Sequence, residues 1–239
     1  MRTTIALPSE HSPFSGAHAS TLRGASELAA AALHRGVRHL VHFTPLCNLP
    51  GIRADGLLSR NRLSGREVLF TDPHRFDGML DWISLSVSFP NYRMFWRKRQ
   101  YDLPGLDWAV LLLDPAVLWR SECLFVPNNA ASMGHALGQR HRFRGPQAFA
   151  SLFDNRDRPP YLPASYPTNV QAEVLVLGQV PASSIRHIAV EDADTLRRTD
   201  SDTRQHIHVA PQWFWPRMDH GAAVSSDHFG RPGGQDRWV

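Results

Sequence analysis

Short apolar runs and runs of alternating apolar and polar residues recur along the chain, separated by turn residues. Runs of this kind predict β-strands, because successive side chains of a strand point to opposite faces. Strands are expected at 39–44, 82–89, 107–114, 185–190, at the start of 123–132 and within 171–181. Residues 206–215 are expected to close the core.

Helical spacing of apolar residues predicts helices between these strands. They are expected at 21–37, 91–100 and 145–155, with single turns at 48–56 and 115–122. In the turn at 48–56, Asn48 is expected to cap the start, Pro50 lies near the start and Gly56 near the end. Residues 59–81 and 127–169 contain no predicted strand. A stretch as long as the second is usually functional or disordered inside a compact domain.

The order of these elements indicates one α+β domain in a chain of 239 residues. We expect a loose lead at 1–20, the domain at 21–217 and a disordered tail at 218–239. No apolar run reaches the roughly 18 residues that a membrane span needs, and the N-terminus lacks the apolar core of a signal peptide. A cytoplasmic protein without a membrane anchor is therefore expected.

The net charge of +4 and the pI near 9.6 are compatible with a polyanionic partner. Lys98 is the only lysine, so a codon preference for arginine explains the balance equally well. Two clusters, 95–100 and 138–145, mix basic and aromatic residues as single-strand binding requires, although a solvated basic face has the same pattern. Cys47 and Cys123 fit no metal-ligand spacing and are expected to be buried thiols.

Polar residues two positions apart lie within or beside several of the predicted strands. His42 and Thr44 share one strand face, as a nucleotide site or a satisfied core histidine would require. Ser84, Ser86 and Ser88 also share a face, which either meets solvent or lines a polar cleft. Glu173 begins a strand, with Gln171 on the same face. Because an unpaired buried carboxylate is costly, we expect Glu173 to be half-exposed at a cleft edge, below the preceding loop.

Taken in order, these motifs resemble the DarT toxins, ADP-ribosyltransferases that modify bases of single-stranded DNA using NAD. The motifs are His-Phe-Thr at 42–44, Asn-Leu-Pro-Gly-Ile at 48–52, Gly-Leu-Leu at 56–58, Arg75 and Gln-Ala-Glu-Val-Leu-Val at 171–176. The resemblance spans about residues 40 to 215. The block at 83–95 is more similar to the guanine-modifying branch, because it lacks the Arg-Ser-Pro-Met of the thymine-modifying branch.

The resemblance implies an ADP-ribosyltransferase-like fold, with a split, antiparallel or mixed central β-sheet and flanking helices around an NAD cleft. It implies that Glu173 and Arg75 are catalytic, with Arg75 on a loop at 61–77 that closes over NAD. A rigid carboxylate beside the ribose would stabilise the positive charge that develops as nicotinamide leaves. NAD would be a co-substrate, without a metal, bound by His42, Phe43, Thr44, Gly51, Leu58 and Arg75.

The resemblance also implies partners. The stretch 126–173 would admit single-stranded DNA, and a cognate antitoxin of the ADP-ribosyl glycohydrolase type would remove the modification. Candidate DNA contacts are Tyr92, Trp96, Arg97, Lys98, Arg99, Arg140, Arg142, Phe143 and Arg144. Two alternatives remain from the sequence: a transferase acting on RNA or protein, and a basic nucleic-acid-binding module without catalysis.

Overall fold

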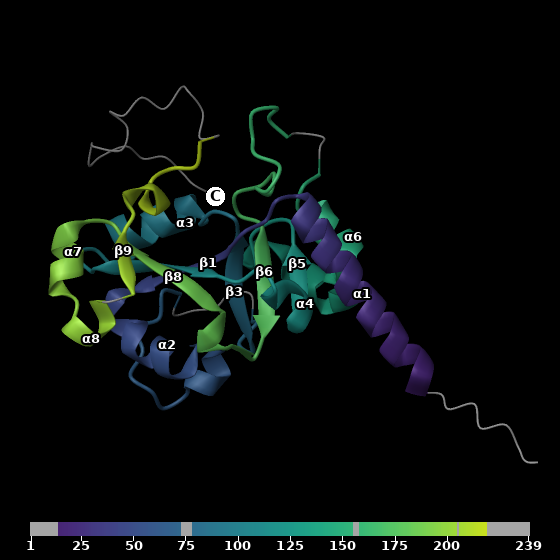
Figure 1. The fold of residues 1–239 in the computed structure, drawn as a ribbon, viewed down its shortest axis with the longest axis horizontal. Helices are drawn as coiled ribbons and strands as arrows, with labels where there is room; N and C mark the ends of the chain where they lie inside the picture. Colours follow the sequence, from purple (N-terminus) through teal and green to yellow (C-terminus); the bar gives the residue numbers. More distant parts are fainter. Residues whose placement is uncertain (1–13, 73–77, 155–157, 205, 219–239) are drawn as a thin grey trace, which may run out of the picture.

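A seven-stranded sheet forms the centre of the computed structural model, which describes residues 14–72, 78–154, 158–204 and 206–218 (Figure 1). The strand order is β5-β6-β3-β1-β4-β8-β9, and neighbours are antiparallel except β8 and β9. Its strands are β1 (Leu40–Pro45), β3 (Trp82–Val87), β4 (Trp108–Leu113), β5 (Cys123–Val126), β6 (Glu173–Leu177), β8 (Ile185–Val190) and β9 (Ile207–Val209). A separate pair joins β2 (Leu57–Leu58) to β7 (Gln179–Val180).

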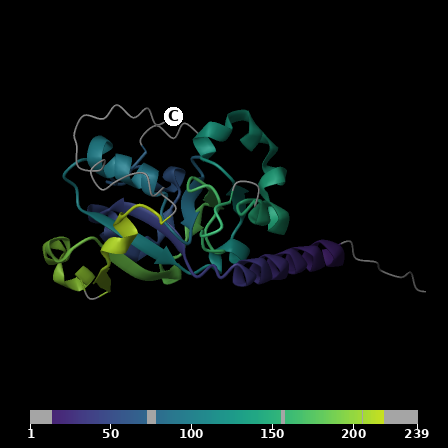
Figure 2. The same cartoon turned by 90° about the horizontal axis from the view of Figure 1, so that it is seen from above.

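Helices flank the sheet. They are α1 (Phe14–His34), α2 (Leu49–Asp55), α3 (Tyr92–Arg97), α4 (Val117–Arg120), α5 (Ala130–Met133), α6 (Gly145–Ser151), α7 (Ala193–Arg198) and α8 (Ser201–Arg204). Helix α1 packs on α4 and α6 beside the β5 edge and extends beyond the sheet in both views (Figures 1 and 2). Short 3-10 or π turns occur at 46–48, 60–63, 98–102, 134–143, 182–184 and 211–214.

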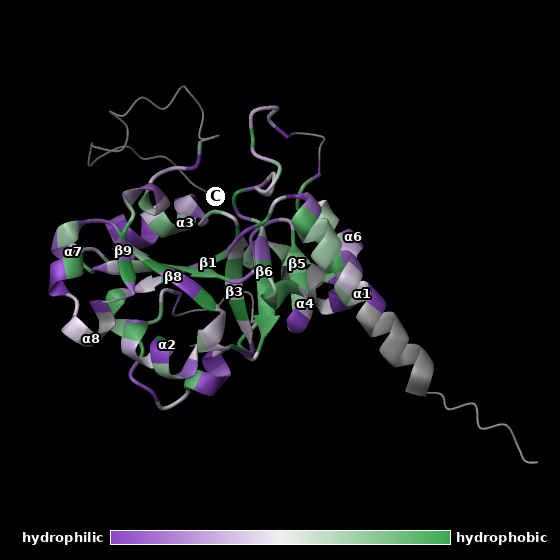
Figure 3. Cartoon of the chain, in the orientation of Figure 1, coloured by the Kyte–Doolittle hydropathy of each residue, from purple (hydrophilic) through white to green (hydrophobic). Residues whose placement is uncertain are grey.

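Alternation along the strands gives the sheet two apolar faces, and apolar residues dominate its strands (Figure 3). Leu40 of β1 and Leu111 of β4 belong to the larger core, under α1, α4 and α6. Their neighbours Val41 and Val110 face the opposite side and pack with Phe95 of α3. The period of two in the sequence therefore reflects a sheet that is covered on both faces.

The sheet is split between β1 and β3. These strands pair only at Leu40 with Val87 and at Val41 with Ser86. Beyond those pairs, β1 continues along β4 as far as Pro45, while the other half of β3 pairs with β6. Beyond these pairs the two strands diverge, and this opening is the fork of the sheet. Side chains or a ligand must fill the gap between the strands.

The predicted strands and the α+β class are confirmed, including the mixed and split sheet. Helix α1 begins at Phe14 rather than at the predicted residue 21. The prediction missed this first part of the helix because residues 14–20 lack helical spacing of apolar residues. Helical turns also occupy 130–143, inside the stretch expected to be irregular, and no strand lies among its described residues. Residues 1–13 and 219–239 lie outside the described part, so the proposed division of the chain stays a prediction.

The two cysteines differ in environment. Cys123 is buried, and desolvation raises the pKa of its thiol to about 12. Cys47 is exposed, so the expectation of two buried thiols is wrong for this residue, which lies in the turn between β1 and α2. Among the described residues, no helix has the length and hydropathy of a membrane span.

Candidate active site

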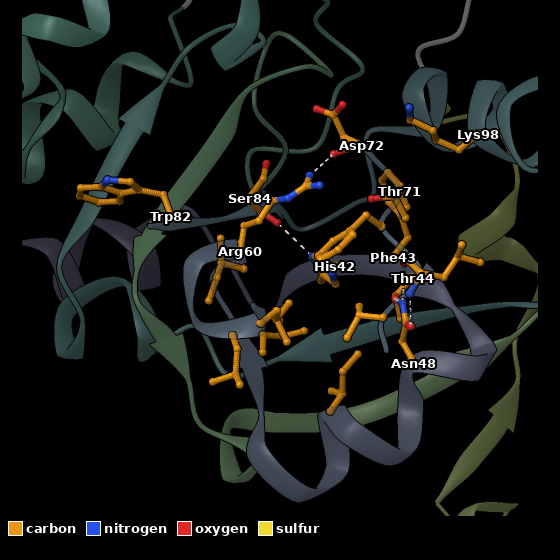
Figure 4. A pocket seen from close by; sticks show the side chains of 18 of the residues that line it. His42, Phe43, Thr44, Asn48, Arg60, Thr71, Asp72, Trp82, Ser84 and Lys98 are labelled. Carbon is orange, nitrogen blue, oxygen red and sulfur yellow. Dashed lines mark hydrogen bonds between the residues drawn. The ribbon is translucent and has the colours of Figure 1, made fainter. Parts of the chain in front are cut away.

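A cavity of about 460 Å³ occupies the gap between the diverging strands β1 and β3 (Figure 4). Its walls come from β1, α2, β2, β3, α3, the segment 60–72, residues 129 and 131, and the first residue of β6. The volume falls within the roughly 300–1,000 Å³ typical of small-molecule and cofactor sites. The fork in the sheet therefore creates a pocket of cofactor size.

Glu173 lies in this cavity and is connected to His42 through Ser84. The Ser84 hydroxyl donates a hydrogen bond of 2.5 Å to Oε2 of Glu173. The Ser84 carbonyl lies 3.0 Å from Nδ1 of His42. A carbonyl only accepts, so Nδ1 must carry a proton and the ring is held in one orientation. One residue of β3 thus fixes both the carboxylate on β6 and the imidazole on β1.

The contact between His42 and Ser84 also bridges the fork in the sheet. In the register of the two β1–β3 pairs, the backbone of β3 would continue opposite His42 and Phe43. The imidazole instead donates a hydrogen bond to the Ser84 carbonyl, which the backbone of β1 no longer reaches. The side chain therefore satisfies a strand carbonyl while holding the cavity open.

Asn48 connects β1 to the segment 60–72, and both line the cavity. Its amide nitrogen donates to Oγ1 of Thr44 at 3.0 Å and to the carbonyl of Leu69 at 2.9 Å. Its amide oxygen accepts from the backbone nitrogen of Leu69 at 3.1 Å. Asn48 was expected to cap α2, but its side chain makes no capping bond and holds this neighbouring segment instead.

Within the same segment, Arg60 at the start contacts residues near the end. The guanidinium donates to the carbonyl of Asp72 at 2.7 Å and lies 4.0 Å from the centre of the Phe70 ring. Lys98 and Arg97 line the cavity from the α3 side. Cationic groups therefore stand on two walls, while Glu173 stands on a third, as a ligand with both anionic and electron-deficient parts would require.

The structure gathers most of the predicted NAD residues around this cavity. His42, Phe43, Thr44, Gly51 and Leu58 all line it together with Glu173. The Phe43 ring also stacks on Phe95, 4.5 Å away between ring centres. Arg75 lies outside the described residues. The roles given to these residues stay predictions.

Three details of the expected cleft differ from the structure. Glu173 is buried, with 7% of its surface exposed, rather than half-exposed, because the Ser84 hydroxyl compensates the desolvated carboxylate. Ser84 and Ser86 line the cavity, as the cleft alternative required, whereas Ser88 lies beyond β3 at a φ of 61°. Gln171 precedes β6 and does not line the cavity.

The candidate DNA residues differ in their surroundings. Arg97 and Lys98 line the cavity, and Arg140 and Arg142 are exposed on the turns at 134–143. Several of the candidates also contact other parts of the protein. Arg99 pairs with Glu191, Arg144 pairs with Glu122, and the Trp96 ring packs edge-on against Tyr101. Arg97 and Lys98 pair with Asp102, and Arg142 donates a hydrogen bond to Gln139. Tyr92 and Phe143 are buried.

Tyr92 and Phe143 were predicted as DNA contacts, and their burial leaves little of either ring accessible to a ligand. Phe143 packs in a cluster with Met79, Trp82 and Leu124, and so belongs to the core below the turns that carry the exposed arginines. Sequence reasoning also missed the contacts of Asn48 and Arg60, and the position of Asn129 in the cavity wall. Nothing in their sequence neighbourhood indicates these long-range contacts. In the described parts of the chain, no His, Cys, Asp and Glu side chains cluster as a metal site would need.

Comparison with known proteins agrees with this geometry. A family model described as "ssDNA thymidine ADP-ribosyltransferase, DarT" matches residues 41–218. The fold resembles Thermus sp. 2.9 DarT in complex with ADP-ribosylated ssDNA, with 14% identity, a TM-score of 0.52 and coverage of 75% of this chain and 97% of that one.

It also resembles Thermosipho africanus DarTG in complex with ADP-ribose, with 18% identity, a TM-score of 0.51 and coverage of 74% of this chain. The match spans 51% of that longer chain. No curated protein sequence matches significantly. Because the family model covers most of its length, the chain belongs to the DarT family of single-stranded-DNA ADP-ribosyltransferases.

Proposed function

We propose that the protein transfers ADP-ribose from NAD to a base of single-stranded DNA. The observation that carries the proposal is the buried carboxylate of Glu173, held by Ser84 in a cofactor-sized cavity. Membership of the DarT family supports the same reaction. The Thermus DarT structure contains ADP-ribosylated single-stranded DNA, which is the product this reaction would form.

The chemistry explains why a rigid carboxylate is needed. The bond between nicotinamide and C1′ of the ribose breaks, and nicotinamide leaves with the bonding electrons. A nitrogen of the base then bonds to C1′ and releases its proton to the solvent. Positive charge is greatest on the ribose in the transition state, so the fixed Glu173 carboxylate stabilises that state more than the ground state.

The remaining walls of the cavity suit the other parts of NAD. In the proposal, His42 and Thr44 contact the nicotinamide ribose, and Gly51 and Leu58 contact the cofactor from α2 and β2. Arg60 and Lys98 supply positive charge near the pyrophosphate. Arg75 would stabilise charge and position NAD; an arginine is a poor base, because its guanidinium keeps its proton at neutral pH.

We propose guanine as the target base. The support is the block at 83–95, which lacks the Arg-Ser-Pro-Met of the thymine-modifying branch. The description of the family model names thymidine, which is the alternative target. Both bases are accessible in a single strand without the energy needed to flip a base out of a duplex.

Incubation with NAD and oligonucleotides that each lack one base tests the proposal. A mass increase of one ADP-ribose is expected on every strand that contains guanine, and on no strand without it. Transfer that requires thymine would correct the base. Transfer only to RNA or protein would replace the acceptor class, and the absence of both transfer and NAD binding would contradict the enzymatic function.

Affinity for single-stranded DNA is expected to depend on salt through the exposed arginines of the turns at 134–143. The double variant Arg140→Ala, Arg142→Ala should reduce the slope of log affinity against log salt by roughly 1.4, since each phosphate contact in a single strand contributes about 0.7. Fluorescence anisotropy at several salt concentrations measures this slope. A slope equal to that of the wild type would remove both residues from the DNA-binding surface.

We propose further that the protein is the toxin of a toxin–antitoxin pair, acting in the cytoplasm. The support is family membership and the resemblance to DarTG. Unregulated modification of DNA bases would block replication, so an ADP-ribosyl glycohydrolase that removes the modification is the expected antitoxin.

A further inference from the structure

Two arginines hold the backbone of the segment 158–168, which lies within the proposed DNA-admitting stretch. Arg158 donates to the carbonyls of Leu162 at 3.3 Å and Tyr166 at 2.7 Å, and also to that of Pro163. From outside the segment, Arg217 donates to the carbonyls of Pro167 at 2.8 Å and Thr168 at 3.2 Å. The loop is therefore an ordered structure without strand or helix.

Arg217 differs from Arg158 because its side chain is buried, with only 3% of the residue surface exposed. Burying a charge is costly unless hydrogen bonds compensate it, so its bonds to two consecutive carbonyls matter to its stability. Its guanidinium also lies 5.9 Å from the centre of the Tyr166 ring. The end of the described chain and the loop lie on the same side of the sheet (Figure 1).

The residues whose carbonyls bind Arg217 lie a few positions before Glu173 in the sequence. Asn169 follows Thr168 and makes a turn in which its carbonyl accepts from Ala172 at 3.1 Å, and β6 then begins at Glu173. The amide of Asn169 also donates to Asn128, at the start of the same stretch, at 3.2 Å. The entry to β6 is thus fixed from both sides.

We propose that Arg217 is a positioning residue for the acceptor DNA. It holds the last turn of the loop at 158–172, so that the loop presents the single-stranded DNA to Glu173 in one arrangement. This role rests on the proposed function, because it assumes that the loop admits DNA. It requires no contact between Arg217 and either substrate, since a preformed loop lowers the entropy lost when the acceptor binds.

The test compares Arg217→Gln with Arg204→Gln. Arg204 is exposed, and it controls for the hydrogen bonds alone, because it also donates to two backbone carbonyls, those of Arg197 and Thr199, in a different region. For Arg217→Gln, the KM for the oligonucleotide should rise about tenfold or more, while the KM for NAD stays within about twofold, as expected when hydrogen bonds from a charged group are lost only on the acceptor side. Arg217→Lys should recover part of the loss, and Arg204→Gln should change neither constant.

Hydrogen exchange provides a readout that does not depend on the reaction. The amides of residues 168–172 should exchange faster in Arg217→Gln than in the wild type and Arg204→Gln. If the wild type transfers nothing to DNA, the proposed function fails, and unchanged exchange would separately refute the structural role of Arg217. An equal rise in both KM values, or an unchanged KM for DNA, overturns the acceptor-specific role.

Discussion

Glu173→Gln is expected to lower the rate of ADP-ribose transfer about a hundred- to thousandfold, or about 3–4 kcal/mol in transition-state stabilisation. Glutamine keeps the shape of the side chain and can still accept the Ser84 hydrogen bond, but it lacks the negative charge. Because that charge acts mainly in the transition state, the dissociation constant for NAD should change little. Single-turnover transfer and calorimetric NAD binding measure the two effects separately.

A second carboxylate in the same cavity provides the control. Glu67 also lines the cavity, but it is exposed and lies on the segment 60–72 rather than on a strand. Glu67→Gln should leave the rate within about threefold of the wild type, because a solvated charge stabilises a nearby cation only weakly. Equal losses in the two variants would show that the cavity needs negative charge in general and not a carboxylate held at 173.

The variant Ser84→Ala separates the effect of the Glu173 charge from the effect of holding that carboxylate in one orientation. The carboxylate remains, but the hydroxyl that holds Oε2 at 2.5 Å is removed. The rate should fall about tenfold, which is less than in Glu173→Gln, as expected for the loss of one hydrogen bond to a charged group. The His42 contact uses the backbone carbonyl of Ser84 and therefore survives the substitution.

The sequence predicts the strands well because each strand signal is local. The run at 82–89 becomes β3 (Trp82–Val87), and the run at 107–114 becomes β4 (Trp108–Leu113). The split between β1 and β3 is not local, since it depends on where pairing stops. Alternation shows that Ser84 and Ser86 share a face, but it cannot show that this face lines a cavity.

The side-chain roles were harder to predict because their partners are distant in sequence. Arg99 follows Lys98 directly, yet its guanidinium pairs with Glu191, while Lys98 lines the cavity. Phe143 stands between two arginines in the sequence, but its ring is buried. A basic cluster therefore predicts charge on a surface, and only the packing of the whole chain decides which of its members remain accessible.

Gly56→Ala is expected to cost about 3 kcal/mol or more of the free energy of unfolding, from backbone strain and from a steric clash. Gly56 has a φ of 79° and a ψ of −168°, a conformation that is essentially restricted to glycine. A Cβ atom there would lie 2.2 Å from the Val180 carbonyl oxygen and 2.7 Å from the Ala182 nitrogen. The melting temperature should fall by roughly 10 °C, as measured by calorimetry.

Gly36→Ala distinguishes the clash from the strain. Gly36 also has a positive φ, 69°, but a Cβ atom there would meet nothing within 4 Å. This variant should lose only about 1 kcal/mol, since its cost is that of the left-handed conformation alone. Gly56 ends α2 where the chain turns into β2, and it lines the cavity. If the two variants melted at the same temperature, the close approach of β7 to Gly56 would not constrain this turn.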